Sequence, residues 1–224
     1  MGRFTLPRDL YHGKGTSETL KTLANSDFPD PLALHAIKMI QRDLPLSFNG
    51  DMDKRTFTHS AQCLPGMAIT NALLGIIHST AHKTGTAFDD CGAYIIHGAA
   101  NAMYLPKVIA FNAKDETAKK RYGQIADFMD LGGDSDEEKV RLLIEHLHNR
   151  SKELNISHGI GTYNADSYPI ERDFIPEEVF LHRLHGIALN ALADACTGSN
   201  PRQPGMEETE KLLKCCHYDT EGDL

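Results

Sequence analysis

The 224-residue chain is 41% hydrophobic and 24% charged, which is the composition of an ordinary globular protein. Its 31 acidic and 23 basic residues give a formal net charge of -8 without a long run of one sign, so we expect neither nucleic acid nor a membrane as a partner. No apolar stretch approaches the roughly 20 residues of a membrane helix, and the polar first residues lack a signal-peptide core, so we expect a cytoplasmic protein.

The N-terminal residues differ in character from the rest of the chain. Apolar residues around Pro7 predict a short strand, the His12 to Gly15 stretch predicts a turn, and residues 17–23 predict the start of a helix. A loop of turn residues follows and ends in Asp30-Pro31, a favourable cap and first position for the next helix. Everything after this loop is typical of helices and their connections.

The body of the chain has helical periodicity throughout. The spacing predicts one helix from Leu34 to Leu44 that Pro45 ends, and a second long pattern over residues 54–81. This pattern contains Pro65 and Gly66, and an internal proline costs about 3 kcal/mol, so we expect a kink or two segments. Further helices are predicted at residues 99–112, 116–129, 136–154, 176–195 and 207–217, with a capping box from Ser135 to Glu138. The predicted fold is therefore mainly α, a helical bundle.

Two residue types that often bind cofactors give weak signals. The five cysteines are scattered and form no CxxC pair, which argues against a disulfide framework and a thiolate zinc site and favours buried or incidental thiols: Cys63, Cys91, Cys196, Cys215 and Cys216. The glycine pair around Lys14 lacks the third glycine and the helix-opening context of a phosphate-binding loop. No residue is therefore assigned to dinucleotide binding.

A cluster of histidines is the most informative feature. His78 and His82 are four residues apart, so on a helix both rings lie on one face, and His97 follows at the start of the next predicted helix. Neutral imidazole is a common ligand for iron and zinc. The alternative is a solvent-facing pair, which the polar neighbours would also fit, and the glutamate of a zinc-protease HExxH motif is absent.

The sequence around these histidines resembles a known family. GIIHSTAHKTG and HGAANAMYLPKVIAFN are similar to the GxxHxxxHxxG and HGxxNAxxLP segments of iron-containing, NAD(P)-dependent alcohol dehydrogenases, including the alcohol dehydrogenase part of bifunctional aldehyde/alcohol dehydrogenases. The resemblance extends through DFPDPLALHAIKMIQRDLPLSFN, RYGQIADFMDLGG and DACTGSNPRQP. It implies a helical metal-binding domain over residues 25–224, and it implies that residues 1–24 are the remnant of a dinucleotide-binding domain that is otherwise missing.

The resemblance also implies roles for individual residues. His78 and His97 match two metal ligands of the family, for Fe(II) or Zn(II), and His82 matches a histidine near the substrate and the nicotinamide that is thought to help proton transfer. The family's other two ligands, an aspartate and a histidine, belong to the missing segment. A third ligand could come from the long loop before His97, from Asp89, Asp90 or Cys91, unless these residues are simply solvated.

Three functions are consistent with these features. The resemblance implies NAD(P)-linked oxidation of a small primary alcohol or reduction of an aldehyde, with activity lost or dependent on a partner chain. A second hypothesis is a helical interaction module whose apolar surface is buried in a homo-oligomer or against a full-length paralogue. A third is a weak metal-binding protein without redox chemistry, which depends on His78 and His97.

Overall fold

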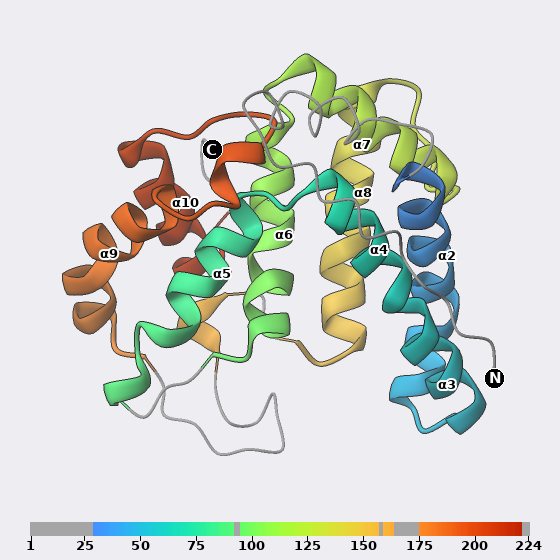
Figure 1. The fold of residues 1–224 in the computed structure, drawn as a ribbon, viewed down its shortest axis with the longest axis horizontal. Coiled ribbons are helices and arrows are strands. Elements are labelled where there is room, and N and C mark those ends of the chain that lie inside the picture. Colours follow the sequence, from blue (N-terminus) through green and yellow to red (C-terminus); the bar gives the residue numbers. More distant parts are fainter. Residues whose placement is uncertain (1–28, 92–94, 157–158, 164–174, 221–224) are drawn as a thin grey trace.

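The computed structural model describes residues 29–91, 95–156, 159–163 and 175–220. Within these ranges the chain is a bundle of α-helices and short 3-10 turns without a strand, which confirms the mainly α prediction (Figure 1). The N-terminal strand and helix predicted within residues 1–24 lie outside the described ranges, and so does the domain boundary at residue 24. No helix in the described ranges is long and apolar enough to cross a membrane.

The helices α2 (Pro29–Phe48), α3 (Met52–Ala61) and α4 (Cys63–Ala72) pack together at one edge of the bundle (Figure 1). The expectation that Pro45 ends the first helix is wrong, because α2 continues to Phe48. Proline leaves the carbonyl of the residue four positions earlier without its helical partner. Here the Gln41 carbonyl accepts a hydrogen bond of 3.3 Å from Arg150 of α8 (Asp136–Glu153), which compensates for that loss.

A buried carboxylate ties α2 to α3. The side chain of Asp43 has no exposed surface and forms ion pairs of 2.5 Å with Arg42 and 3.2 Å with Lys54. The hydrogen bonds from Arg42, and secondarily the pairing with Lys54, lower the pKa of Asp43 to about 2 despite its burial. Asp43 is therefore ionised over the whole physiological pH range.

The long pattern over residues 54–81 forms three helices rather than one kinked helix or two segments. The first break precedes Pro65, which lies in the first turn of α4, where backbone N–H groups have no helical partner and proline is tolerated. The second break lies at residues 73–75, where Leu73 has a φ of 64°. Helix α5 (Ile76–Thr86) then begins in a new direction and carries the first two histidines.

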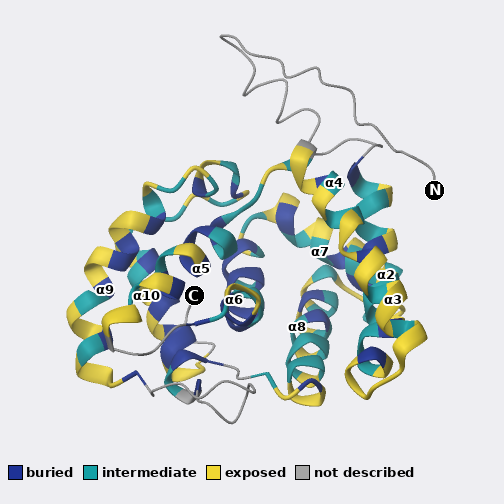
Figure 2. Ribbon diagram, turned by 60° about the horizontal axis from the view of Figure 1, so that its bottom comes forward, coloured by how far each residue is buried: buried dark blue, intermediate teal, exposed yellow. Residues whose placement is uncertain are grey.

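Two hydrophobic cores lie on opposite sides of α6 (His97–Asn112), the most buried helix of the bundle (Figure 2). The larger core joins α6 to α5, α9 (Glu177–Leu192) and α10 (Met206–Tyr218). The smaller core joins α6 to α7 (Glu116–Phe128) and α8. Helix α6 is thus fixed from both sides, which gives the histidine at its N-terminus a rigid support.

The predicted capping box of α8 forms only in part. The Ser135 hydroxyl accepts a hydrogen bond of 3.2 Å from the backbone N–H of Glu138, as expected. The Glu138 carboxylate, however, accepts from the backbone N–H of Asp134 at 3.0 Å, one residue earlier than the motif predicts. The two Gly residues at 132 and 133 both have positive φ, and they turn the chain so that the Asp134 N–H faces this carboxylate.

Candidate metal centre

The N-terminus of α5 is held by a side chain from a distant part of the sequence. The amide oxygen of Asn200 accepts a hydrogen bond of 3.2 Å from the backbone N–H of Ile76. Asn200 is itself held by a 2.7 Å hydrogen bond to the buried amide oxygen of Asn112. The approach is so close that a Cβ on Gly75 would lie 2.7 Å from the Asn200 oxygen. The helix that carries His78 and His82 therefore has a fixed starting point.

The three histidines of the predicted site converge. The ring centroids of His78 and His97 are 5.4 Å apart, those of His82 and His97 are 5.2 Å apart, and those of His78 and His82 are 6.1 Å apart. Two imidazoles that bind one tetrahedral ion through bonds of about 2.0–2.1 Å place their centroids about 5 Å apart. The spacing of His78 and His97 therefore fits the two metal ligands that the resemblance implies, although their roles stay a prediction.

Both of these rings have surroundings that suit a metal ligand. Burial lowers the pKa of His78 below its ordinary value, and the neighbouring His97 and His82 lower it further, so His78 is neutral at neutral pH. The amide of Asn101 lies 3.0 Å from Nε2 of His97, and its nitrogen also donates to the His97 carbonyl at 2.9 Å, so the side chain of Asn101 holds this ring at the start of α6. A metal ion at the same nitrogen would displace this amide contact.

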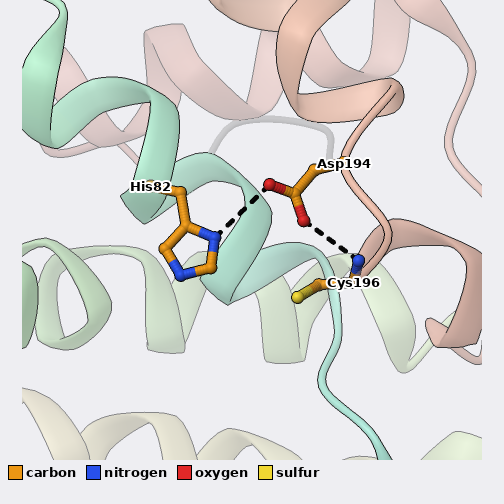
Figure 3. Close-up of side chains that lie close together, drawn as sticks. All are labelled: His82, Asp194 and Cys196. Carbon is orange, nitrogen blue, oxygen red and sulfur yellow. Dashed lines mark hydrogen bonds and ion pairs between the residues drawn. The ribbon is translucent and has the colours of Figure 1, made fainter.

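A second group of ligand atoms lies beside the histidines. Nδ1 of His82 faces the carboxylate of Asp194 at 3.4 Å, and the thiol of Cys196 lies next to it (Figure 3). In the described part of the chain, these three residues form a group of metal-binding side chains whose ligand atoms all lie within 4.8 Å of one another. The sequence prediction missed Asp194 and treated Cys196 as a buried or incidental thiol.

Several contacts fix the charge of this group. The hydrogen bond from the backbone N–H of Cys196 and the 3.0 Å ion pair with Lys83 hold the pKa of Asp194 well below its usual range. Burial and the adjacent Asp194 carboxylate raise the pKa of the Cys196 thiol. At neutral pH the group therefore contains a carboxylate beside a protonated thiol.

Of the third ligands suggested for the loop before His97, the two aspartates belong to no group of metal-binding side chains in the described part of the chain, and the side chain of Cys91 lies outside that part. Asp90 forms a two-point ion pair with Arg183 of α9, with distances of 2.5 and 2.8 Å. Asp89 is exposed in the 3-10 turn η1 (Asp89–Cys91). Asp194 and Cys196, which group with His82, come instead from the segment after α9, more than 100 residues further along the chain than this loop.

These features define a helical domain that presents imidazoles at the junction of α5 and α6. The sequence profile of the Fe-containing alcohol dehydrogenase family, C-terminal, matches residues 16–216, and the chain belongs to this family. The resemblance found in the two histidine motifs is thereby confirmed.

Individual relatives agree with this assignment. The NADPH-dependent butanol dehydrogenase of Clostridium saccharobutylicum is 46% identical over 200 residues, which cover 89% of this chain and 47% of that protein. The aldehyde-alcohol dehydrogenase of Clostridium acetobutylicum is 35% identical, over 89% of this chain and 23% of that protein. The structure of the iron-containing alcohol dehydrogenase from Thermococcus thioreducens matches 87% of this chain and 45% of its own, with 30% identity and a TM-score of 0.71. The chain thus spans about half of the single-function relatives and about a quarter of the bifunctional one.

Proposed function

We propose that this chain is the metal-side half of an NAD(P)-dependent alcohol dehydrogenase and that it turns over a small primary alcohol or aldehyde only when another chain supplies the nucleotide-binding half. The observation that carries this proposal is the convergence of His78, His82 and His97 from two helices. The rigid support of α6 between two cores keeps this arrangement in place.

In this proposal the present chain supplies metal ligands and the second chain supplies the nucleotide site. Fe(II) or Zn(II), when bound by His78 and His97, would act as a Lewis acid on the alcohol oxygen. Two imidazoles hold a divalent ion weakly, because a catalytic site normally has three protein ligands. The His82 side chain is 39% exposed, and its ring centroid lies 5.2 Å from that of His97, so in this proposal it exchanges a proton with a substrate held beside His97. In this proposal the second chain supplies the remaining ligands and the nucleotide site.

A complementation assay tests this proposal. The purified chain with Fe(II) or Zn(II), NADPH and butyraldehyde is expected to show no turnover. Addition of a separately expressed nucleotide-binding half of the butanol dehydrogenase relative, including its first metal-binding helix, is expected to restore NADPH oxidation. His97→Ala should abolish the restored activity, because it removes one of the two imidazole ligands.

The matched control is His182→Ala, which removes an exposed histidine of α9. This variant should be restored as well as the wild type. Restored activity that is unchanged by His97→Ala would contradict the assigned site, and turnover by the chain alone would contradict the need for a partner.

A specific observation favours the interaction module as a second function. Large apolar side chains are exposed around the turn between α2 and α3, at 46–66% of their surface: Leu46, Phe48, Met52 and Phe57. Exposed apolar residues that gather on one edge are typical of a contact surface. We propose that this edge forms a homodimer.

Light scattering tests the dimer. The wild-type chain should have about twice the mass of the 24.8 kDa protomer, and Phe48→Ser combined with Phe57→Ser should reduce it to the protomer mass. Leu189→Ser is the control, because Leu189 is 53% exposed on α9, at the opposite edge of the bundle. A monomeric wild type would contradict the proposal.

A further inference from the structure

We propose that His82, Asp194 and Cys196 form a zinc site of their own, distinct from the pair His78 and His97. Two elements build it. Helix α5 contributes His82, and the turn between α9 and the 3-10 turn η4 (Thr197–Ser199) contributes the carboxylate and the thiol (Figure 3). This turn is fixed, since the backbone N–H of Cys196 donates to Oδ1 of Asp194 at 3.0 Å and Thr197 hydrogen-bonds to Ser79 of α5 at 2.7 Å.

The distances suit a shared ion better than direct hydrogen bonds. His82 Nδ1 and Asp194 Oδ2 are 3.4 Å apart, which is longer than the 2.7–3.2 Å of a good hydrogen bond. Two ligand atoms on one tetrahedral zinc ion, each at about 2.0–2.1 Å, lie about 3.3 Å apart. The Cys196 sulfur, a ring nitrogen of His82 and a carboxylate oxygen of Asp194 all lie within 4.8 Å of one another, so a small rotation of the Cys196 side chain would bring the sulfur to the same ion.

The combination of imidazole, carboxylate and thiol ligands favours zinc over magnesium and calcium. Mg²⁺ and Ca²⁺ prefer oxygen ligands alone, whereas imidazole together with thiolate suits Zn(II). The thiol proton of Cys196 leaves to solvent when the sulfur binds the ion, while Asp194 is already ionised and His82 binds as neutral imidazole. Two negative ligands then balance the charge of Zn(II). Lys83 remains beside Asp194, because a carboxylate can accept from a lysine and bind a metal ion at once.

Such a site would have three protein ligands and an open fourth position. His82 is 39% exposed and the Asp194 side chain is 11% exposed, so the ion can enter from solvent and keep a bound water. The site would also restrain the histidine that the resemblance assigns to proton transfer. Zinc binding here needs neither alcohol turnover nor a partner chain to be measured, so it goes beyond the proposed function.

Titration with Co(II) tests the zinc site without an activity assay. Co(II) bound to a thiolate has an intense near-ultraviolet charge-transfer band, and the purified wild-type chain is expected to show this band and to lose it when Zn(II) is added. Cys196→Ser should remove the band and weaken Zn(II) binding by more than about 100-fold, because changes next to a metal ligand already cost about 10- to 100-fold. Binding should release about one proton per ion.

Two variants serve as matched controls. Cys63→Ser removes an exposed cysteine of α4, and His78→Ala removes a ligand of the other predicted site, so both should keep the band. The proposal would be overturned if the wild-type chain bound no Co(II) or bound it without the band. It would also be overturned if the band disappeared in His78→Ala or persisted in Cys196→Ser. His97→Ala tests the two proposals separately. It should lose the restored dehydrogenase activity of the complementation assay but keep the cobalt–thiolate band.

Discussion

Asp219→Ala is expected to lower the free energy of unfolding by about 3 kcal/mol through the lost ion pair, the lower end of the range for breaking a buried ion pair, and backbone strain adds to this loss. Lys107 of α6 is only 1% exposed, and its ammonium group donates to Asp219 at 2.6 Å. Asp219 ends α10, so this pair connects two helices of the larger core. The loss falls at the lower end because Asp219 is 33% exposed, which leaves water partial access to the lysine.

Two comparison variants separate charge from backbone strain. Asp219 has a left-handed backbone conformation with a φ of 51°, in which alanine costs about 1–2 kcal/mol but asparagine is tolerated. Asp219→Asn should therefore cost less than Asp219→Ala, because it removes only the charge. Lys107→Met should cost about 1 kcal/mol or less, since an apolar side chain of similar length suits the core.

Urea unfolding of the three variants provides the measurement. The expected order of destabilisation is Asp219→Ala, then Asp219→Asn, then Lys107→Met. If Lys107→Met proved as damaging as Asp219→Ala, the ammonium group of Lys107 would stabilise the fold beyond its pair with Asp219, because methionine keeps most of the packing of the lysine side chain.

The positions of the helices could be predicted from local sequence because their signals are local. Apolar spacing and the turn residues located α6 to α10 within a few residues of their observed ends. The helix through Pro45 could not be predicted, since its support is Arg150, a residue about 100 positions away that donates to the carbonyl freed by the proline. The break at Leu73 was missed for a similar reason, because the Asn200 contact that fixes the following helix is not local.

The candidate site was also predicted only in part, because only some of its signals are local in the sequence. The spacing of His78 and His82 on one helix predicted that their rings share a face, and the two motifs of the family predicted that His97 joins them. Nothing local indicated that Asp194 and Cys196 lie beside His82, more than 100 residues away. The one available signal was the stretch DACTGSNPRQP, which resembles the family as a whole and places a carboxylate, a thiol and Asn200 within seven positions.

Asn200→Ala is expected to lower the free energy of unfolding by about 2–6 kcal/mol and to weaken Co(II) binding by about tenfold. The residue is 5% exposed, and its loss leaves the N–H of Ile76 and the amide oxygen of Asn112 buried without their hydrogen bonds. Each such group costs about 1–3 kcal/mol. Because Ile76 begins the helix that carries His82, the same change loosens a metal ligand.

Asn200→Asp distinguishes the two effects. A carboxylate can still accept from the Ile76 N–H, and negative charge is favourable at a helix N-terminus, so α5 should keep its position. The carboxylate cannot donate to the Asn112 amide oxygen or to the Arg202 carbonyl, each 2.7 Å from the Asn200 amide nitrogen, so stability should still fall. We therefore expect Asn200→Asp to be destabilised but to bind Co(II) nearly as well as the wild type, by urea unfolding and cobalt titration. Equal Co(II) affinity in Asn200→Ala would mean that packing against α6 and α9 alone positions His82.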